Sequence, residues 1–175
     1  MWFDMRKETL AFVERAPLVH VSEVEIAAPR PAVFAAFATP QSWPQWFPNV
    51  RDASYASAPP HGVHAIRHAH VGATHWVEEM IAWDVDVRLA WTVTRASVPF
   101  ARAQVEAFEL ADTGNGTRVR WTLALEPRWL ARLGAPFTPR VVARLFDRAA
   151  RNLAVHLRNA ASDTTAGERS ARDEQ

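Results

Sequence analysis

Residues 29–50, PRPAVFAAFATPQSWPQWFPNV, decide the fold class because they predict two short helices directly after a strand. Pro29 and Pro31 end the preceding strand. The alanine-rich segment AVFAAFA is predicted to be helical and to stop at Pro40, because the residue before a proline avoids helical backbone angles. The segment SWPQWF adds a second turn of helix. The elements on either side of this stretch identify the architecture.

Strands are predicted on both sides of these helices. Residues 18–26, LVHVSEVEI, are rich in β-branched residues, which favour a strand. Between Val50 and Glu126, segments of strand character alternate with turn signals such as APPHG and DTGNG, a spacing typical of an antiparallel meander. The clearest strand, 117–126, alternates polar residues with Val119, Trp121, Leu123 and Leu125. Such a sheet buries one face.

After Pro127 the hydrophobic pattern changes to a helical period. One broad apolar stripe is formed by Val141, Val142, Leu145, Phe146, Ala149, Leu153 and Leu157. We therefore predict an α+β fold of the helix-grip type. In it, a curved antiparallel sheet of about seven strands wraps around a long C-terminal helix, with two short helices after the first strand and an extra N-terminal helix.

The chain of 175 residues is long enough for one well-buried core, so one ligand-binding domain is predicted over residues 18–160. Residues 1–17 are predicted to form an amphipathic helix, because Phe3, Leu10 and Val13 recur at helical spacing. Residues 161–175 have no apolar periodicity and are predicted to be a disordered tail.

Composition narrows the functional classes. No cysteine is present, which excludes disulfides, thiolate catalysis and cysteine-ligated zinc. A formal charge of +1 gives little attraction for nucleic acid, so no nucleic-acid partner is expected. No apolar run is long enough for a membrane span and no signal sequence is evident, so we expect a cytoplasmic protein without stable membrane insertion. No P-loop or dinucleotide fingerprint occurs, and no cofactor is expected.

Several segments together resemble a known family. They are residues 29–50, Gly62 at the start of a strand, the hairpin MIAWDVDVRLAW at 80–91, and the strand start Gly116-Thr117-Arg118-Val119. They are similar to the polyketide cyclase/dehydrase branch of the START and birch-pollen-allergen superfamily, over about residues 18–157. The resemblance implies a cavity between the sheet and the C-terminal helix. Known members bind lipids, hormones, isoprenoid quinones or polyketide intermediates, and only some are enzymes.

Eight tryptophans either fill the core or line that cavity, and both interpretations stay open. Strand alternation and the family's hairpin pattern predict that one set of side chains points inward: Trp76, Glu78, Met80, Leu89, Trp91, Val93 and Arg95. If so, Glu78 and Arg95 must pair with each other, with His68 or with a polar group of the ligand, because an unpaired buried charge is costly. The alternative is a β-bulge that turns one of them outward.

The candidate catalytic residues are Arg95, Glu78 and His68. The predicted ligand-binding residues are Phe37, Trp46, Phe47, His68, Trp76, Glu78, Met80, Trp91, Val93, Arg95, Phe108, Trp121, Leu123, Leu145 and Leu153. No metal site is predicted, because histidines two apart on a strand lie about 7 Å from each other and no dense ligand motif accompanies them.

Three functions are compatible with this sequence. The first is binding, as a carrier or sensor, of a small hydrophobic molecule such as an aromatic polyketide, lipid or isoprenoid quinone, and we favour it over catalysis. The second is a polyketide aromatase/cyclase or dehydratase-like enzyme that uses Arg95, Glu78 and His68 to polarise carbonyls. The third is protein interaction, including a homodimer, through an exposed N-terminal helix that carries Trp2, Phe3 and Phe12.

Overall fold

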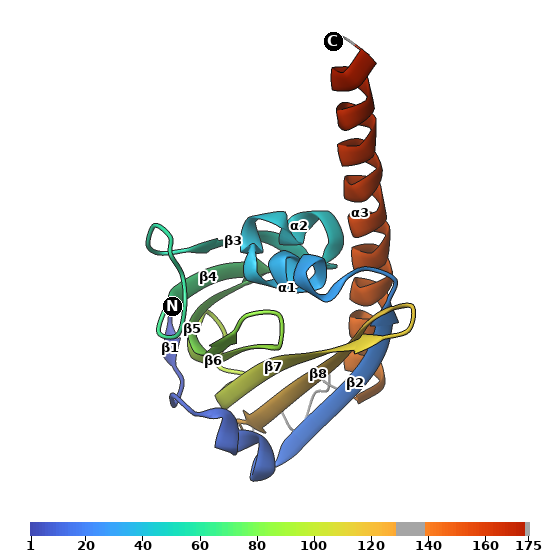
Figure 1. Cartoon of the computed structure of the whole chain (residues 1–175). Helices are drawn as coiled ribbons and strands as arrows, with labels where there is room; N and C mark the ends of the chain where they lie inside the picture. The colour runs from blue at the N-terminus through green and yellow to red at the C-terminus, as the bar shows by residue number, and fades with distance from the viewer. Residues whose placement is uncertain (129–138, 174–175) are drawn as a thin grey trace.

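Antiparallel strands form one curved sheet beside a long C-terminal helix in the computed structural model, which describes residues 1–128 and 139–173, with side chains over 1–128 and 143–160 (Figure 1). The strand order is β2-β8-β7-β6-β5-β4-β3, with β1 paired to β6. The strands are β1 (Phe3–Asp4), β2 (Leu18–Ile26), β3 (Val50–Tyr55), β4 (Ile66–Val71), β5 (Thr74–Asp84), β6 (Arg88–Ala96), β7 (Ala101–Thr113) and β8 (Gly116–Pro127). The predicted helix-grip fold is confirmed.

Two short helices separate β2 from β3, which lie at opposite edges of the sheet. They are α1 (Arg30–Ala38) and α2 (Trp43–Trp46), joined by the 3-10 helix η2 (Pro40–Ser42). Each begins with a proline in its first two positions, where the missing N–H leaves no hydrogen bond unmade. The two helices predicted from residues 29–50 are therefore confirmed.

The C-terminal helix α3 (Pro139–Asp173) packs against β2 and both short helices. Its apolar stripe buries Phe146, Ala149 and Leu153. Val141 and Val142 of the predicted stripe lie outside the residues whose side chains are described. The helix continues to Asp173, past the sheet in Figure 1, where the sequence predicted a disordered tail from residue 161. That segment contains no proline that would break the helix.

The N-terminal segment differs from the prediction of one helix over residues 1–17. It forms β1, an extended stretch and the 3-10 helix η1 (Leu10–Glu14). Strands β6 and β7 pair only as far as Thr92↔Val105, and the segment uses the backbone groups left free beyond that point. The Met5 amide donates to the Thr94 carbonyl at 2.8 Å, and the Arg6 amide donates to that of Arg102 at 2.7 Å. Backbone pairing has overridden the local helical pattern.

This docking removes most of the proposed exposed anchor. Phe12 is only 1% exposed and Met5 is buried, whereas Trp2 remains 44% exposed. Phe12 packs with Ala103, Val105 and Ala124 on the outer face of the sheet. The prediction that an undocked N-terminal helix presents Phe12 to a partner is wrong.

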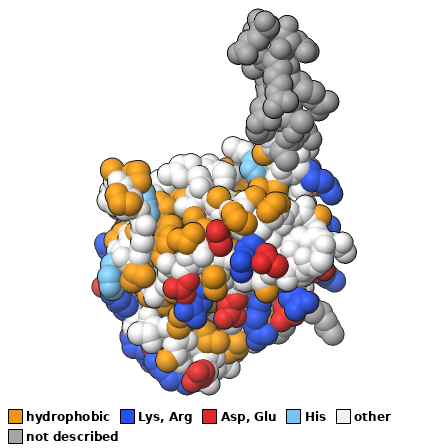
Figure 2. All heavy atoms as spheres, in the orientation of Figure 1, with side chains coloured by type: hydrophobic (Ala, Val, Ile, Leu, Met, Phe, Trp, Pro, Cys, Tyr) orange, Lys and Arg blue, Asp and Glu red, His pale blue; other side chains and the backbone are white. Residues whose placement is uncertain are grey.

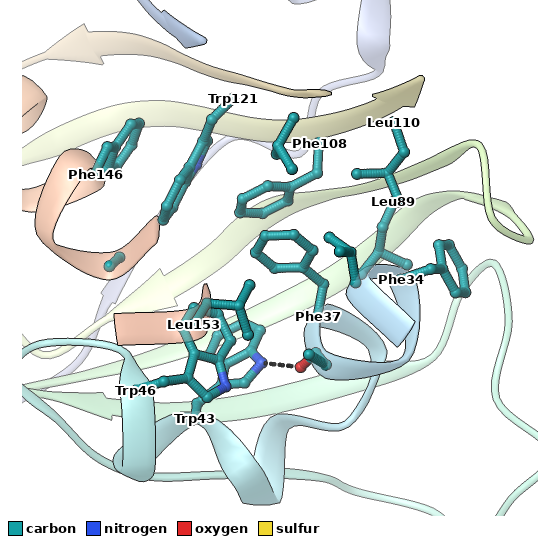
Figure 3. Packing of buried hydrophobic residues seen from close by; sticks show 14 of the residues in the cluster. Phe34, Phe37, Trp43, Trp46, Leu89, Phe108, Leu110, Trp121, Phe146 and Leu153 are labelled. Carbon is teal, nitrogen blue, oxygen red and sulfur yellow. Dashed lines mark hydrogen bonds between the residues drawn. The ribbon is translucent and has the colours of Figure 1, made fainter. Parts of the chain in front are cut away.

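Aromatic side chains fill one part of the space between the sheet and α3 (Figure 3). Phe37 of α1 stacks on Phe108 of β7 with ring centroids 4.1 Å apart. Trp121 of β8 stacks on Phe146 of α3 at 3.5 Å. Such rings bury large apolar areas and pack with specific geometry, so this part of the interior is a conventional core. The remaining interior space forms the pocket described next.

Candidate functional site

An apolar pocket of about 420 Å³ lies between the inner face of the sheet, α2 and α3, within the size range of about 300–1,000 Å³ typical of small-molecule sites. Its apolar lining is formed by Trp43, Phe47, Val50, Ala69, Val71, Trp76, Trp91, Val98, Phe100, Leu123, Leu145 and Phe146. Its polar lining is formed by Thr74, Glu78, Gln104 and Glu106. The walls are mostly apolar, with aromatic rings from several elements, and the polar groups are few.

Along most of β5 and β6, the side chains predicted to point inward do so. Trp76 and Glu78 line the pocket from β5, and Met80 is fully buried in the adjoining core. Trp91 lines the pocket from β6. Val93 also points inward but packs in a separate cluster with Met5.

Arg95 does not reach the pocket, so its predicted inward orientation is wrong. Val77 pairs with Arg95 and Glu78 pairs with Val93, which leaves Thr94 without a partner on β5. This β-bulge reverses the side-chain direction beyond it. The Arg95 side chain is 49% exposed on the outer face of the sheet. There its Nε lies 3.3 Å from Asp4 Oδ1, and its guanidinium lies over the Trp2 ring.

His68 is also outside the pocket, because the opposite face of β4 points inward. Ala69 pairs with Trp76 and lies on the inner face, whereas His68 is exposed. The histidines of this region therefore do not serve the pocket. Among the described residues, no three histidine, aspartate or glutamate side chains lie together as a metal site.

The partner of Glu78 is Arg67, a residue absent from the predicted site. Arg67 is fully buried and lies opposite Glu78 across β4 and β5. Its Nε donates to Glu78 Oε2 at 2.6 Å, and its guanidinium lies 4.1 Å from the ring centroids of both Trp43 and Trp91. The ion pair and the two indole faces together compensate a buried cation.

A sequence signal for Arg67 was available in the β4–β5 turn. Gly72 has a φ of 61°, and the pairing runs back from Val71↔Thr74 to Arg67↔Glu78 without a shift. A two-residue turn at Gly72-Ala73 places Arg67 opposite Glu78 by counting alone. The requirement that Glu78 be paired then identifies the arginine.

Glu106 is the second carboxyl group of the pocket wall, on β7. Its Oε1 accepts from Gln104 Nε2 at 2.8 Å and its Oε2 accepts from Trp121 Nε1 at 3.2 Å. Burial, reinforced by the negative charge of Glu78, raises the pKa of Glu106 from 4.5 to about 7, against the opposing effects of the Trp121 hydrogen bond and the Arg67 charge. Glu106 therefore changes its protonation near neutral pH.

The predicted ligand-binding residues thus fall into three groups. Those that line the pocket are Phe47, Trp76, Glu78, Trp91, Leu123 and Leu145. Those buried in the adjoining core, or beside it, are Phe37, Trp46, Met80, Val93, Phe108, Trp121 and Leu153. His68 and Arg95 face outward. The polar residues at or beside the pocket that were not predicted are Arg67, Thr74, Gln104 and Glu106.

The surface of the protein is mixed in charge. Acidic and basic side chains are interspersed on the face seen in Figure 2. Several form ion pairs, such as Arg120 with Glu23 at 3.0 Å and Arg6 with Glu126 at 2.6 Å. In the described part of the chain, no helix combines the length and hydrophobicity needed to cross a membrane.

The sequence of this chain matches a known protein family over most of its length. The family model described as polyketide cyclase / dehydrase and lipid transport matches residues 19–158. No curated protein matches the chain in sequence.

Solved structures resemble the fold at low sequence identity. Ginseng major latex-like protein 151 from Panax ginseng is 15% identical with a TM-score of 0.65, covering 79% of this chain and 96% of its own. The Zhui aromatase/cyclase from Streptomyces sp. R1128 is 15% identical with a TM-score of 0.65, covering 81% and 93%. A START superfamily protein from Mycobacterium smegmatis is 14% identical with a TM-score of 0.63, covering 81% and 98%. These likenesses show a shared fold.

Proposed function

The chain belongs to the polyketide cyclase / dehydrase and lipid transport family, and on this premise we propose that it binds a small hydrophobic molecule of aromatic or isoprenoid character, as a carrier or sensor. The observation that carries this proposal is the pocket of about 420 Å³. An apolar, aromatic lining with a few polar groups is the usual form of a small-molecule site.

The positions of Arg95, Glu78 and His68, the candidate catalytic residues, favour a binding function over catalysis by these three side chains. Two of the three candidate catalytic residues, Arg95 and His68, face solvent. The third, Glu78, is held by Arg67. A convergent set of arginine, glutamate and histidine at the ligand is therefore not available for polarising a carbonyl.

The proposal is tested with the full chain purified without denaturants. Native mass spectrometry is expected to detect a small molecule bound to the purified protein. If the purified protein is empty, it is expected to bind one ligand per chain when ligand is added. Fluorescence of the eight tryptophans, three of which (Trp43, Trp76 and Trp91) line the pocket, is then followed during titration with an anthraquinone, a short-chain ubiquinone and a fatty acid. Saturable quenching supports the proposal. No bound molecule and no quenching by any of the three would refute it.

A second candidate function rests on Glu106. A carboxyl group with a pKa of about 7 beside a substrate pocket can act as a general base and then as a general acid. In a dehydration, Glu106 would take the proton from the carbon next to a carbonyl. It would then deliver this proton to the departing β-hydroxyl group, so that a C=C bond forms and water leaves.

This alternative has its own test. Incubation with 4-hydroxy-4-phenylbutan-2-one is expected to yield benzylideneacetone, which is followed by its absorbance. The rate should be lost in Glu106→Gln and retained in Glu109→Gln, since Glu109 is exposed on the same strand. No product above the uncatalysed reaction, or equal rates in both variants, would dismiss the dehydratase function while leaving the binding proposal intact.

A further inference from the structure

The polar part of the pocket wall is acidic. Glu78 is 5% exposed and lines the pocket, and its Oε2 accepts from Arg67. Within the part of the chain that the structure describes, no donor meets its other oxygen, Oε1. This oxygen is not fully buried, so a ligand in the pocket that brings an N–H or O–H group can donate to it.

The arginine and indole donors of Arg67 and Trp91 near the pocket are covered by protein. Nη1 and Nη2 of Arg67 and Nε1 of Trp91 are buried and meet no acceptor among the described residues. Arg67 itself does not line the pocket, whereas Trp43 and Trp91, whose ring centroids both lie 4.1 Å from its guanidinium, do. A ligand in the pocket therefore meets the carboxyl groups before it meets the arginine.

The charges of this region do not balance. Arg67 contributes one positive charge, and Glu78 and Glu106 contribute two negative charges when both are ionised. Glu106 receives hydrogen bonds from Gln104 and Trp121, both neutral groups, so no cation pairs with it among the described residues. One further positive charge would neutralise the set.

We propose that the ligand of this pocket is a hydrophobic amine, whose protonated nitrogen pairs with Glu78 and Glu106 while its apolar body packs against the aromatic walls. The inference rests on the proposed function and names the chemical class of ligand. The ammonium supplies donors for the open carboxylate oxygen and the missing charge. The aromatic ring of Trp76, which lines the pocket, adds a favourable environment for a cation. A carboxylic acid of the same shape adds a third negative charge and is disfavoured.

The test compares three ligands that share one hydrocarbon body: 2-naphthylmethylamine, 2-naphthylmethanol and 2-naphthoic acid. Affinities are measured by calorimetry with the full chain at about pH 8, where a carboxyl group with a pKa near 7 is ionised. We expect the amine to bind at least about tenfold more tightly than the alcohol, and the acid more weakly than both. Glu106→Gln should remove the amine's advantage and leave the alcohol's affinity unchanged. Glu109→Gln should behave as wild type.

The outcomes separate the inference from the function on which it rests. The neutral dye Nile red serves as a probe of the apolar pocket. If the protein binds Nile red or the alcohol but shows no preference for the amine, or keeps that preference in Glu106→Gln, the inference is overturned and the binding function stands. If neither Nile red nor any of the three naphthalenes binds, the binding function itself fails. Alcohol binding by Glu106→Gln also verifies that this variant is folded.

Discussion

Arg67 and Glu78 occupy directly opposed positions on β4 and β5, and the guanidinium Nε donates to the Glu78 carboxylate at 2.6 Å behind the wall of an apolar pocket. The pair is almost fully buried. The guanidinium lies 4.1 Å from the ring centroids of both Trp43 and Trp91. Of the two carboxyl groups in the pocket wall, Glu106 is therefore the one without a cationic partner among the described residues.

Breaking this pair should destabilise the fold. We expect Arg67→Met to lower the free energy of unfolding by about 3–5 kcal/mol, because Glu78 is left buried without its cation. The double variant Arg67→Met/Glu78→Leu should recover most of this loss, since it removes both charges. Urea unfolding measures both effects. A double variant no more stable than Arg67→Met would argue against the ion pair as the cause.

The protonation of Glu106 should make stability depend on pH. Its pKa in the folded state, about 7, lies above the ordinary value of 4.5. The folded state therefore holds a proton that the unfolded state has released, and the free energy of unfolding falls as pH rises from 4.5 to about 7. The charges that face this carboxyl group are those of Glu78 and Arg67.

Substitution of Glu106 isolates this effect. We expect the stability of Glu106→Gln relative to wild type to rise by about 1–3 kcal/mol between about pH 5 and about pH 8. The surface variant Glu109→Gln should show no such trend. Urea unfolding at both pH values provides the measurement, and parallel pH profiles for wild type and Glu106→Gln would exclude a raised pKa.

The N-terminal segment should contribute to stability through Phe12. Phe12→Ala removes a ring that is 1% exposed and should cost about 3–5 kcal/mol. The matched variant Trp2→Ala, at a side chain that is 44% exposed, should change stability by less than about 1 kcal/mol. Equal effects in thermal unfolding would mean that the segment does not dock as described.

Gly116 should tolerate no side chain, because a Cβ there would meet the Ile26 carbonyl oxygen at 2.2 Å. Gly116→Ala should therefore lower the free energy of unfolding by about 1–3 kcal/mol as β8 moves away from the end of β2. Gly114 lies in the same turn and has open space around it, so Gly114→Ala serves as the control. Similar melting temperatures for the two variants would contradict this close approach.

The sequence predicted elements well where one face is clearly apolar. The strand predicted at 117–126 appears as β8 (Gly116–Pro127), because alternation of large apolar and polar residues fixes both its extent and its inner face. Residues 18–26 form β2 with the predicted bounds, although neither face of this strand is cleanly apolar, because its β-branched residues favour a strand. In these strands, local pattern and tertiary packing agree.

The polar site was harder to predict because its signals are not periodic. Strand β4, IRHAHV, carries polar residues on both faces, so alternation alone does not reveal that Arg67 and not His68 points inward. The orientation of Arg95 depends on a β-bulge at Thr94, which has no composition signal in this strand. Pairing across the Gly72 turn was the one constraint able to place the arginine.

The central claim is that the pocket beside α3 takes up an apolar ligand, and filling it tests this most directly. Ala69→Leu extends a side chain from the pocket wall into the cavity, whereas His68→Leu makes a comparable change on the outer face of the same strand. In a Nile red fluorescence titration, with folding verified by circular dichroism, we expect Ala69→Leu to weaken binding at least about tenfold and His68→Leu to bind as wild type does. A folded Ala69→Leu protein that binds Nile red as tightly as wild type would contradict the account.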